Sequence, residues 1–344
     1  MLLCMAAVSC SIVPAPESTE TVDVELRIGV DGGGLETGSG AWTKAAGSKA
    51  ETDIHSLRVI ACATDDDGSV SVVYHSEKIT TFTMNSGQPH VVLPVPKVPA
   101  GSVTFYVVAN EDALGQEVLT DEVLADPAGL SSLLYIDNYQ LPDGGVERNV
   151  RFPIDGFGSQ EASIATNGLP MSGLTTVEVT SGMNPVTVNL ERMVAKVLVQ
   201  VENAISEAIV MENRIDFTNF VGDRTYLFPE AGDGGRGDVP DGVVYTSLNT
   251  ENPDDGTSIK GTTTCENFYT AYILPCGGTG DSGLSLTLYR EDGTSCTGTI
   301  PGNVVIPRNT QMTILAQINE KVGISISFEV LPWTAYNINV PVFD

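Results

Sequence analysis

Basic residues are scarce in this chain of 344 residues. Lysine and arginine together number 17 against 44 aspartates and glutamates, which gives a formal net charge of −27. A surface of this charge repels the phosphate backbone of DNA and RNA, so the composition argues against a nucleic-acid partner. Strong negative charge also keeps an exposed protein soluble, which suits work outside the cell.

Few residues have the chemistry for catalysis, and those present match no known catalytic or metal-binding motif. The three histidines are His55, His75 and His90, and their spacing matches no metal site. The chain has no G-x-S-x-G elbow, no P-loop and no H-E-x-x-H motif. Carboxylates are so frequent that no pair of them indicates a glycosidase. We therefore expect no catalytic residue, no cofactor and no metal, and a function other than that of an enzyme.

Two short motifs suggest ligands but have simpler explanations. The letters DDDG at residues 65–68 offer carboxylates to calcium, yet the rest of an EF-hand loop is missing and a plain hairpin turn fits better. The letters RGD at residues 236–238 spell an integrin-type tripeptide inside a long acidic, glycine-rich loop that we expect over 229–264. A solvated loop explains that tripeptide as a chance occurrence.

Long hydrophobic runs are absent, since no segment approaches the ~20 apolar residues that a membrane-spanning helix needs. The first ten residues read MLLCMAAVSC, a short apolar run with small residues leading into Cys10. This arrangement looks like a bacterial lipobox, which predicts a leader over 1–10 and lipidation of Cys10. No basic residue precedes the run, so the leader is expected to be truncated at its start. The alternative is a frayed apolar terminus with an incidental cysteine.

The remaining cysteines show no C-x-x-C spacing. Loss of the leader leaves four thiols, at Cys62, Cys265, Cys276 and Cys296. An exported location permits disulfides, and buried free thiols fit the sequence equally well.

What the chain has in abundance is apolar alternation with a period of two. A Pro-, Ser- and Glu-rich tether over 11–20 leads into a predicted strand with apolar residues at Val22, Val24, Leu26, Ile28 and Val30. A Gly- and Ser-rich loop over 32–48 follows, with lysines at Lys44 and Lys49. The chain ends on a second alternating strand, at Tyr336, Ile338, Val340 and Val342.

Between these ends, short strand patterns recur with turns between them, and a helical insertion is expected over 121–139. Many short strands and little helix predict an all-β fold. The length favours two β-sandwich domains, which we place at 21–187 and 188–344, with short helical insertions.

Several stretches, taken in order, carry a resemblance to a known family. They read IHSLRV at 54–59, FYVVAN at 105–110, LERMVAKV at 190–197, IPRNT at 306–310 and VLPW at 330–333. Together they resemble the fimbrillin family, the major fimbrial subunits of Gram-negative gut and oral anaerobes. The resemblance implies two transthyretin-like (Greek-key type) domains, export as a lipoprotein, trimming by a protease behind an N-terminal strand, and polymerisation by strand donation.

The hypothesis that follows is a structural subunit of a surface fimbria that supports adhesion. In it, cleavage at Lys44 or Lys49 releases the strand at 22–30, and the strand at 336–342 of a neighbouring subunit fills the groove. Its partners would be other fimbrial subunits, the outer membrane, a processing protease and host or bacterial surface ligands.

Three alternatives stay open. Fimbrillin stalk subunits usually have arginine at the trimming site, whereas this loop offers only lysine, so the chain could be an uncut tip or anchor subunit. A glycan-binding surface lipoprotein of the same architecture is a further alternative, although the chain has only two tryptophans. Finally, both terminal strands could be permanent members of their own sheets.

Overall fold

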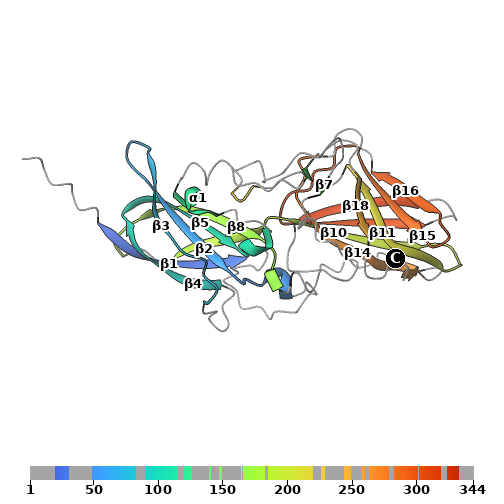
Figure 1. Ribbon diagram of the computed structural model, residues 1–344, viewed down its shortest axis with the longest axis horizontal. Coiled ribbons are helices and arrows are strands. Elements are labelled where there is room, and N and C mark those ends of the chain that lie inside the picture. Colours follow the sequence, from blue (N-terminus) through green and yellow to red (C-terminus); the bar gives the residue numbers. More distant parts are fainter. Residues whose placement is uncertain are drawn as a thin grey trace, which may run out of the picture.

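The computed structural model describes residues 20–30, 49–82, 90–114, 119–125, 139–140, 147–148, 164, 166–182, 185–219, 226–228, 244–248, 257–259, 263–278, 283–300, 302–318 and 324–332. Strands dominate these residues, as expected from the sequence, and form two lobes (Figure 1). Helix is confined to short pieces, among them α1 (Asp121–Ala125) and the 3-10 turns η1 (Lys49–Thr52) and η2 (Glu111–Leu114). No helix within the described ranges is long and apolar enough to span a bilayer.

The first lobe is built on one seven-stranded sheet with the order β3-β2-β5-β8-β9-β1-β4. Its strands are β1 (Thr21–Val30), β2 (Leu57–Thr64), β3 (Val70–His75), β4 (His90–Pro99), β5 (Gly101–Ala109), β8 (Met171–Val179) and β9 (Val186–Arg192). β8 pairs with β9 only at Met171–Arg192 and Ser172–Glu191, so the sheet bends there and its two arms enclose a single core.

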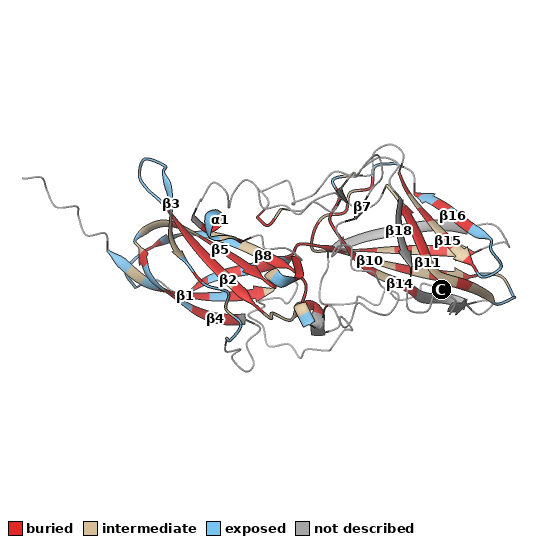
Figure 2. Cartoon of the chain, viewed as in Figure 1, coloured by how far each residue is buried: buried red, intermediate tan, exposed pale blue. Residues whose placement is uncertain are grey.

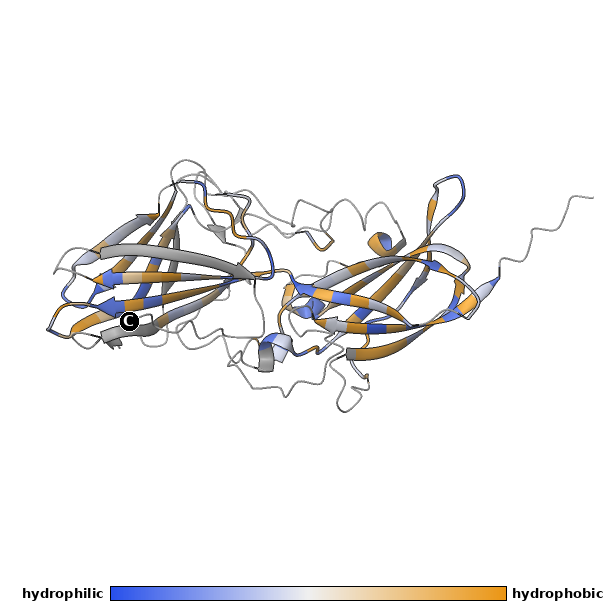
Figure 3. Cartoon of the chain, turned by 180° about the vertical axis from the view of Figure 1, so that it is seen from behind, coloured by the Kyte–Doolittle hydropathy of each residue, from blue (hydrophilic) through white to orange (hydrophobic). Residues whose placement is uncertain are grey.

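The core of the first lobe follows directly from the period of two. Inward residues of both arms are buried at alternate positions, including Leu26 and Ile28 on β1 and Val59 and Phe105 on β2 and β5 (Figure 2). The same alternation appears as orange and blue bands along the strands in Figure 3. Because a slip of one residue would turn the inward apolar residues of β1 away from this core, the pairing register is strongly specified.

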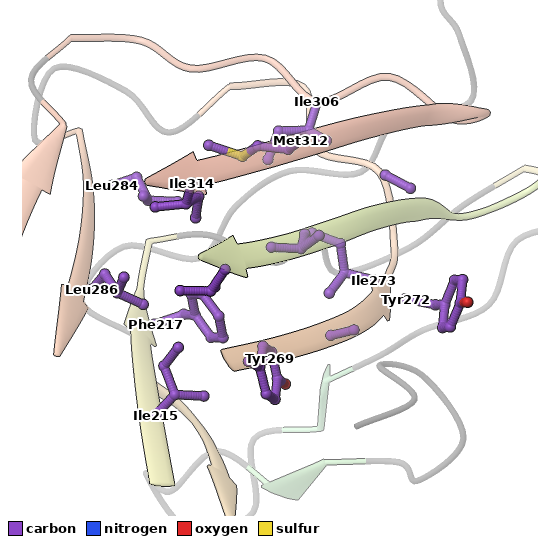
Figure 4. Close-up of a cluster of buried hydrophobic side chains, with 14 of the residues drawn as sticks. Ile215, Phe217, Tyr269, Tyr272, Ile273, Leu284, Leu286, Ile306, Met312 and Ile314 are labelled. Carbon is purple, nitrogen blue, oxygen red and sulfur yellow. The ribbon is translucent and has the colours of Figure 1, made fainter. Parts of the chain in front are cut away.

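The second lobe has two sheets, with the orders β14-β10-β17-β18 and β12-β11-β15-β16, and β13 also pairs with β11. Their strands are β10 (Ala195–Asn203), β11 (Ile209–Thr218), β12 (Val244–Leu248), β13 (Thr257–Ile259), β14 (Thr263–Ile273), β15 (Leu284–Arg290), β16 (Ser295–Ile300), β17 (Thr310–Ile318) and β18 (Ile324–Pro332). Side chains from both sheets share one buried cluster, in which the rings of Phe217 and Tyr269 lie 5.7 Å apart (Figure 4). A small separate ribbon pairs β6 (Tyr139–Gln140) with β7 (Glu147–Arg148).

The two lobes repeat one strand plan. β1 lies between an antiparallel neighbour, β4, and a parallel neighbour, β9. β10 likewise lies between antiparallel β14 and parallel β17. In the remaining strands, the order β3-β2-β5-β8 corresponds to β12-β11-β15-β16. β18, which pairs with β17 along its whole length, has no counterpart among the described strands of the first lobe.

Two sequence expectations about local structure were wrong in part. The helix expected over 121–139 begins as α1, residues 126–138 lie outside the described part of the chain, and Tyr139 lies in β6 instead. The expected long loop over 229–264 contains β12 and β13 and the first residues of β14. β12 and β13 are 5 and 3 residues long, so each holds too few alternating positions to leave a clear apolar pattern in the sequence.

Candidate functional site

The predicted N-terminal strand is an interior member of the first sheet. Leu26 of β1 lies opposite Leu93 of β4 on one side and opposite Val186 of β9 on the other. The backbone of β1 is therefore paired with β4 along most of its length and with β9 from Leu26 to Val30. Withdrawal of β1 would leave the edges of β4 and β9 unpaired and facing each other, which is a template for another strand.

The two faces of β1 differ sharply. Val24, Leu26 and Ile28 are buried at 3%, 0% and 0% exposure, and Val22 and Val30 are half-buried against the same core. The opposite face carries an exposed ion pair, with Arg27 Nε 3.2 Å from Glu25 Oε1. The alternating apolar residues of the predicted N-terminal strand are therefore part of the core of the first lobe.

Most other residues singled out in the sequence lie outside the described part of the chain. These are Cys10, Lys44, Tyr336, Ile338, Val340 and Val342, together with the tripeptide at 236–238. Lys49 is the first residue of η1. Cys62, Cys276 and Cys296 are buried free thiols, and Cys265 lies on β14.

The acidic turn at 65–68 closes the hairpin of β2 and β3, as expected. Gly68 has φ of 84° and donates from its backbone N–H to Asp65 O at 2.9 Å. Ser69 donates to Asp67 Oδ1 at 2.9 Å and to Asp65 Oδ2 at 3.1 Å, and these bonds occupy the carboxylates. Hydrogen bonds from Ser69 also lower the pKa of Asp67. Among the described residues, no group of three or more His, Cys, Asp or Glu side chains is placed to hold a metal.

A second candidate site lies where the two lobes meet, and the stretches that carry the family resemblance converge there. Glu51, in η1 of the first lobe, is only 4% exposed. Its Oε1 accepts hydrogen bonds from Lys196 Nζ at 2.7 Å and from the Tyr272 hydroxyl at 2.6 Å. Its backbone carbonyl accepts from Arg192 Nε at 3.1 Å. One residue of the first lobe is thus held by β9, β10 and β14.

Arg192 extends this network into the loop before β17. Its Nη1 donates to Asn309 Oδ1 at 2.9 Å, and Asn309 N–H donates to Val194 O at 3.0 Å. Asn309 has φ of 55°, a left-handed conformation that asparagine tolerates better than most residues. The last residue of the first sheet is thereby fixed to the second lobe.

Arg308 crosses the junction at a buried position with a side chain 4% exposed. Its Nη2 donates to Ser172 Oγ at 2.8 Å and to Glu191 O at 3.1 Å. Its Nη1 donates to the carbonyls of Tyr226 and Leu227, at 3.2 and 3.3 Å. Burial lowers the pKa of Arg308 to about 10, partly opposed by Glu191, whose Oε2 lies 3.7 Å from Nε.

Asn110 holds the segment 53–56, which leads from η1 into β2. It has φ of 60°, and its Oδ1 accepts from His55 N–H at 2.7 Å. Its Nδ2 donates to Asp53 O at 3.0 Å and to Leu169 O at 2.8 Å. A Cβ on Gly168 would lie 2.2 Å from Asn110 Nδ2, so only glycine leaves room for this amide.

Apolar segments also cross the junction in both directions. Leu227 and Phe228, from the chain after β11, join a buried cluster on the outer face of the first sheet, where the Phe228 ring meets Tyr106 edge-on at 4.9 Å. Ile164 and Leu169, from the chain before β8, belong to the core cluster of the second lobe.

Four of the junction residues lie within the family-like stretches, but no pattern in the sequence assigns them a role. They are Arg192, Lys196, Arg308 and Asn309. A charged residue inside an apolar run, such as Lys196, was the available signal. Glu51 and Tyr272 were missed, and no local pattern marks either residue.

The fold and these two sites define a structural β protein held together by an extended polar junction. A family model described as "Fimbrillin-A associated anchor proteins Mfa1 and Mfa2" matches residues 24–339. The chain belongs to this family. Membership makes it a fimbria-associated surface protein rather than an enzyme, which confirms the family resemblance and the non-enzymatic role expected from the sequence.

Solved structures were compared as well. A putative cell adhesion protein from Bacteroides eggerthii is 16% identical, with 91% of this chain and 96% of that chain covered and a TM-score of 0.52, which supports a shared fold. The tip fimbrial protein Mfa3 from Porphyromonas gingivalis is 15% identical (91% and 100% covered, TM-score 0.49), and a fimbrial assembly protein from Parabacteroides distasonis is 12% identical (91% and 96%, 0.48). A comparison with curated proteins found no match.

Proposed function

We propose that this chain is an accessory subunit of a surface fimbria, of the anchor class, exported as a lipoprotein and attached to the outer membrane through Cys10. The observation that carries the proposal is the match of residues 24–339 to a family of fimbrillin-associated anchor proteins. That match favours the accessory alternative over a major polymerising stalk subunit. The partners proposed are fimbrillin and other fimbrial subunits, with host or bacterial surface ligands reached through the fimbria.

We propose two transthyretin-like domains for the two lobes. The repeated strand plan and the separate core clusters support this proposal. The division predicted from the sequence, between residues 187 and 188, falls inside β9. Because β9 pairs with β1 of the first sheet, we move the proposed boundary to Met193, directly after β9.

An anchor role constrains proteolysis. Cys10 precedes β1 in the chain, and both Lys44 and Lys49 follow β1. Cleavage at either lysine would separate a lipid on Cys10 from everything beyond the cut. A subunit that holds a fimbria to the membrane therefore has to keep the loop intact, with β1 in place as an interior strand. Trimming at Lys44 or Lys49 belongs to the stalk alternative, in which β1 leaves and a donated strand replaces it.

For assembly, we propose that the strand at 336–342 is the segment that this subunit contributes to a neighbour. Its apolar residues alternate like those of β1, which fill a slot between two strand edges in the first sheet. An alternating apolar strand can gain backbone hydrogen bonds and side-chain burial together in such a slot.

The test is a Cys10→Ser variant in cells that assemble fimbriae. Loss of the acylated thiol should move this protein from the outer-membrane fraction to the soluble fraction and shed fimbriae into the medium. Ser9→Ala is the matched control, because it keeps a small residue before the cysteine. Retention of the Cys10→Ser protein and of the fimbriae on the membrane would count against the anchor proposal.

A further inference from the structure

The junction residues point to a mechanical property that goes beyond the proposed function. We infer that the two lobes form one rigid, cooperatively unfolding unit, and that Glu51 is the residue on which their coupling depends. Two flexibly joined domains would meet through an exposed linker with few buried contacts. Here the contact is buried, polar and supplied from several strands.

The Glu51 contacts are preorganised by the second lobe. Lys196 on β10 and Tyr272 on β14 lie directly opposite each other in the antiparallel register, so their side chains project from the same face. Both polar groups reach Oε1 of Glu51 at 2.7 and 2.6 Å. A rotation of one lobe against the other would break both hydrogen bonds together.

Burial makes that break costly. The side chains of Glu51 and Lys196 are 5% and 14% exposed. A buried carboxylate that loses its cationic partner without gaining water is strongly destabilised, much more than an exposed pair would be. The lobes therefore cannot reorient by small steps, because intermediate orientations would leave the buried carboxylate of Glu51 without its hydrogen-bond donors.

Apolar exchange across the junction supports the same conclusion independently. Phe228 of the second lobe packs on the first sheet, and Leu169 of the first packs in the core of the second. Separating the lobes would expose both. Unfolding of either lobe then removes part of the other's packing, which is the condition for a shared transition.

Differential scanning calorimetry of the full chain tests the inference. The unmodified protein should show one transition whose van't Hoff enthalpy equals the calorimetric enthalpy of the whole chain. Glu51→Lys places two ammonium groups together and should split this into two transitions. The charge exchange Glu51→Lys with Lys196→Glu restores opposite charges and should return the protein toward a single transition.

The matched control is Glu111→Lys, within the first lobe. Glu111 pairs with Arg58 through two hydrogen bonds of 2.8 Å, at side-chain exposures of 15% and 13%. This variant should lower the melting temperature without splitting the transition. Tyr272→Phe, which deletes one donor to Glu51, is the milder junction variant and should lower the ratio of van't Hoff to calorimetric enthalpy below one. Two transitions in the unmodified protein, or an unchanged ratio in Glu51→Lys and Tyr272→Phe, would overturn the inference.

Discussion

At the scale of single residues, the junction depends on side chains that can do two things at once. Asn110 and Asn309 both adopt positive φ, at 60° and 55°. The amide oxygen of Asn309 accepts a hydrogen bond from Arg192 across the junction, and that of Asn110 accepts one from His55 within the first lobe. Asparagine combines a tolerance for this backbone conformation with donors and an acceptor. A glycine would keep the conformation and lose the bonds, and an alanine would lose both.

Cys62 gives a prediction at this scale. Its side chain is 1% exposed, and burial raises the pKa of the thiol from 9.0 to about 11. The folded protein should therefore resist alkylation of Cys62 at pH 8, because the thiolate is the nucleophile and is nearly absent. Iodoacetamide labelling followed by peptide mass spectrometry should find Cys62 modified only after denaturant is added. Labelling of Cys62 in the native protein would contradict the burial.

The same thiol predicts a direction for stability against pH. A folded pKa above the unfolded one means that folding favours the protonated form. This contribution is fully present below pH 9 and is lost as pH rises through 11. Burial also raises the pKa of Tyr106, which acts in the same direction at alkaline pH. Denaturant titrations at pH 8 and pH 10.5 should show lower stability at the higher pH.

At the scale of elements, apolar alternation is the pattern that predicts strands. β1 and the hairpin of β2 and β3 lie where the sequence predicts them. The pattern fails in β12 and β13, because strands of 5 and 3 residues hold too few alternating positions to show a period of two. The helix expected over 121–139 is borne out at α1 and is wrong at Tyr139, which lies in β6.

The two candidate sites also differ in how far the sequence predicts them. The apolar alternation of β1 is a local pattern, visible in the nine consecutive residues 22–30. The junction could not be predicted in this way, because its bonds join residues far apart in the sequence. Glu51 and Arg192 are separated by 141 positions, Glu51 and Lys196 by 145, and Glu51 and Tyr272 by 221. No spacing rule links residues at such separations.

β1 gives the prediction for a single element. Leu26→Ala should lower the free energy of unfolding by about 2–5 kcal/mol, because Leu26 is fully buried between the arms of the first sheet. Arg27→Ala, one residue along on the exposed face, removes only the pair with Glu25 and should cost less than ~1 kcal/mol. Guanidinium titrations of both variants measure the difference. Equal effects would mean that β1 does not contribute its inner face to the core.

At the scale of the whole molecule, the two lobes and their junction suit a part that transmits load. A fimbrial anchor is pulled at one end by the fimbria and held at the other by the membrane. A buried junction that unfolds only together with the lobes would transmit this force without bending between them. The net charge of −27 would keep such a subunit soluble and limit its non-specific association.

The central claim is that this subunit remains an intact, lipid-bearing chain. The direct measurement is the intact mass of the protein extracted from the outer membrane of cells that produce it. We predict one species in which residues 10–344 are continuous and Cys10 is acylated, with β1 still attached to the rest of the chain. A mature protein that begins just after Lys44 or Lys49 and has no lipid would contradict the anchor account and favour a processed stalk subunit.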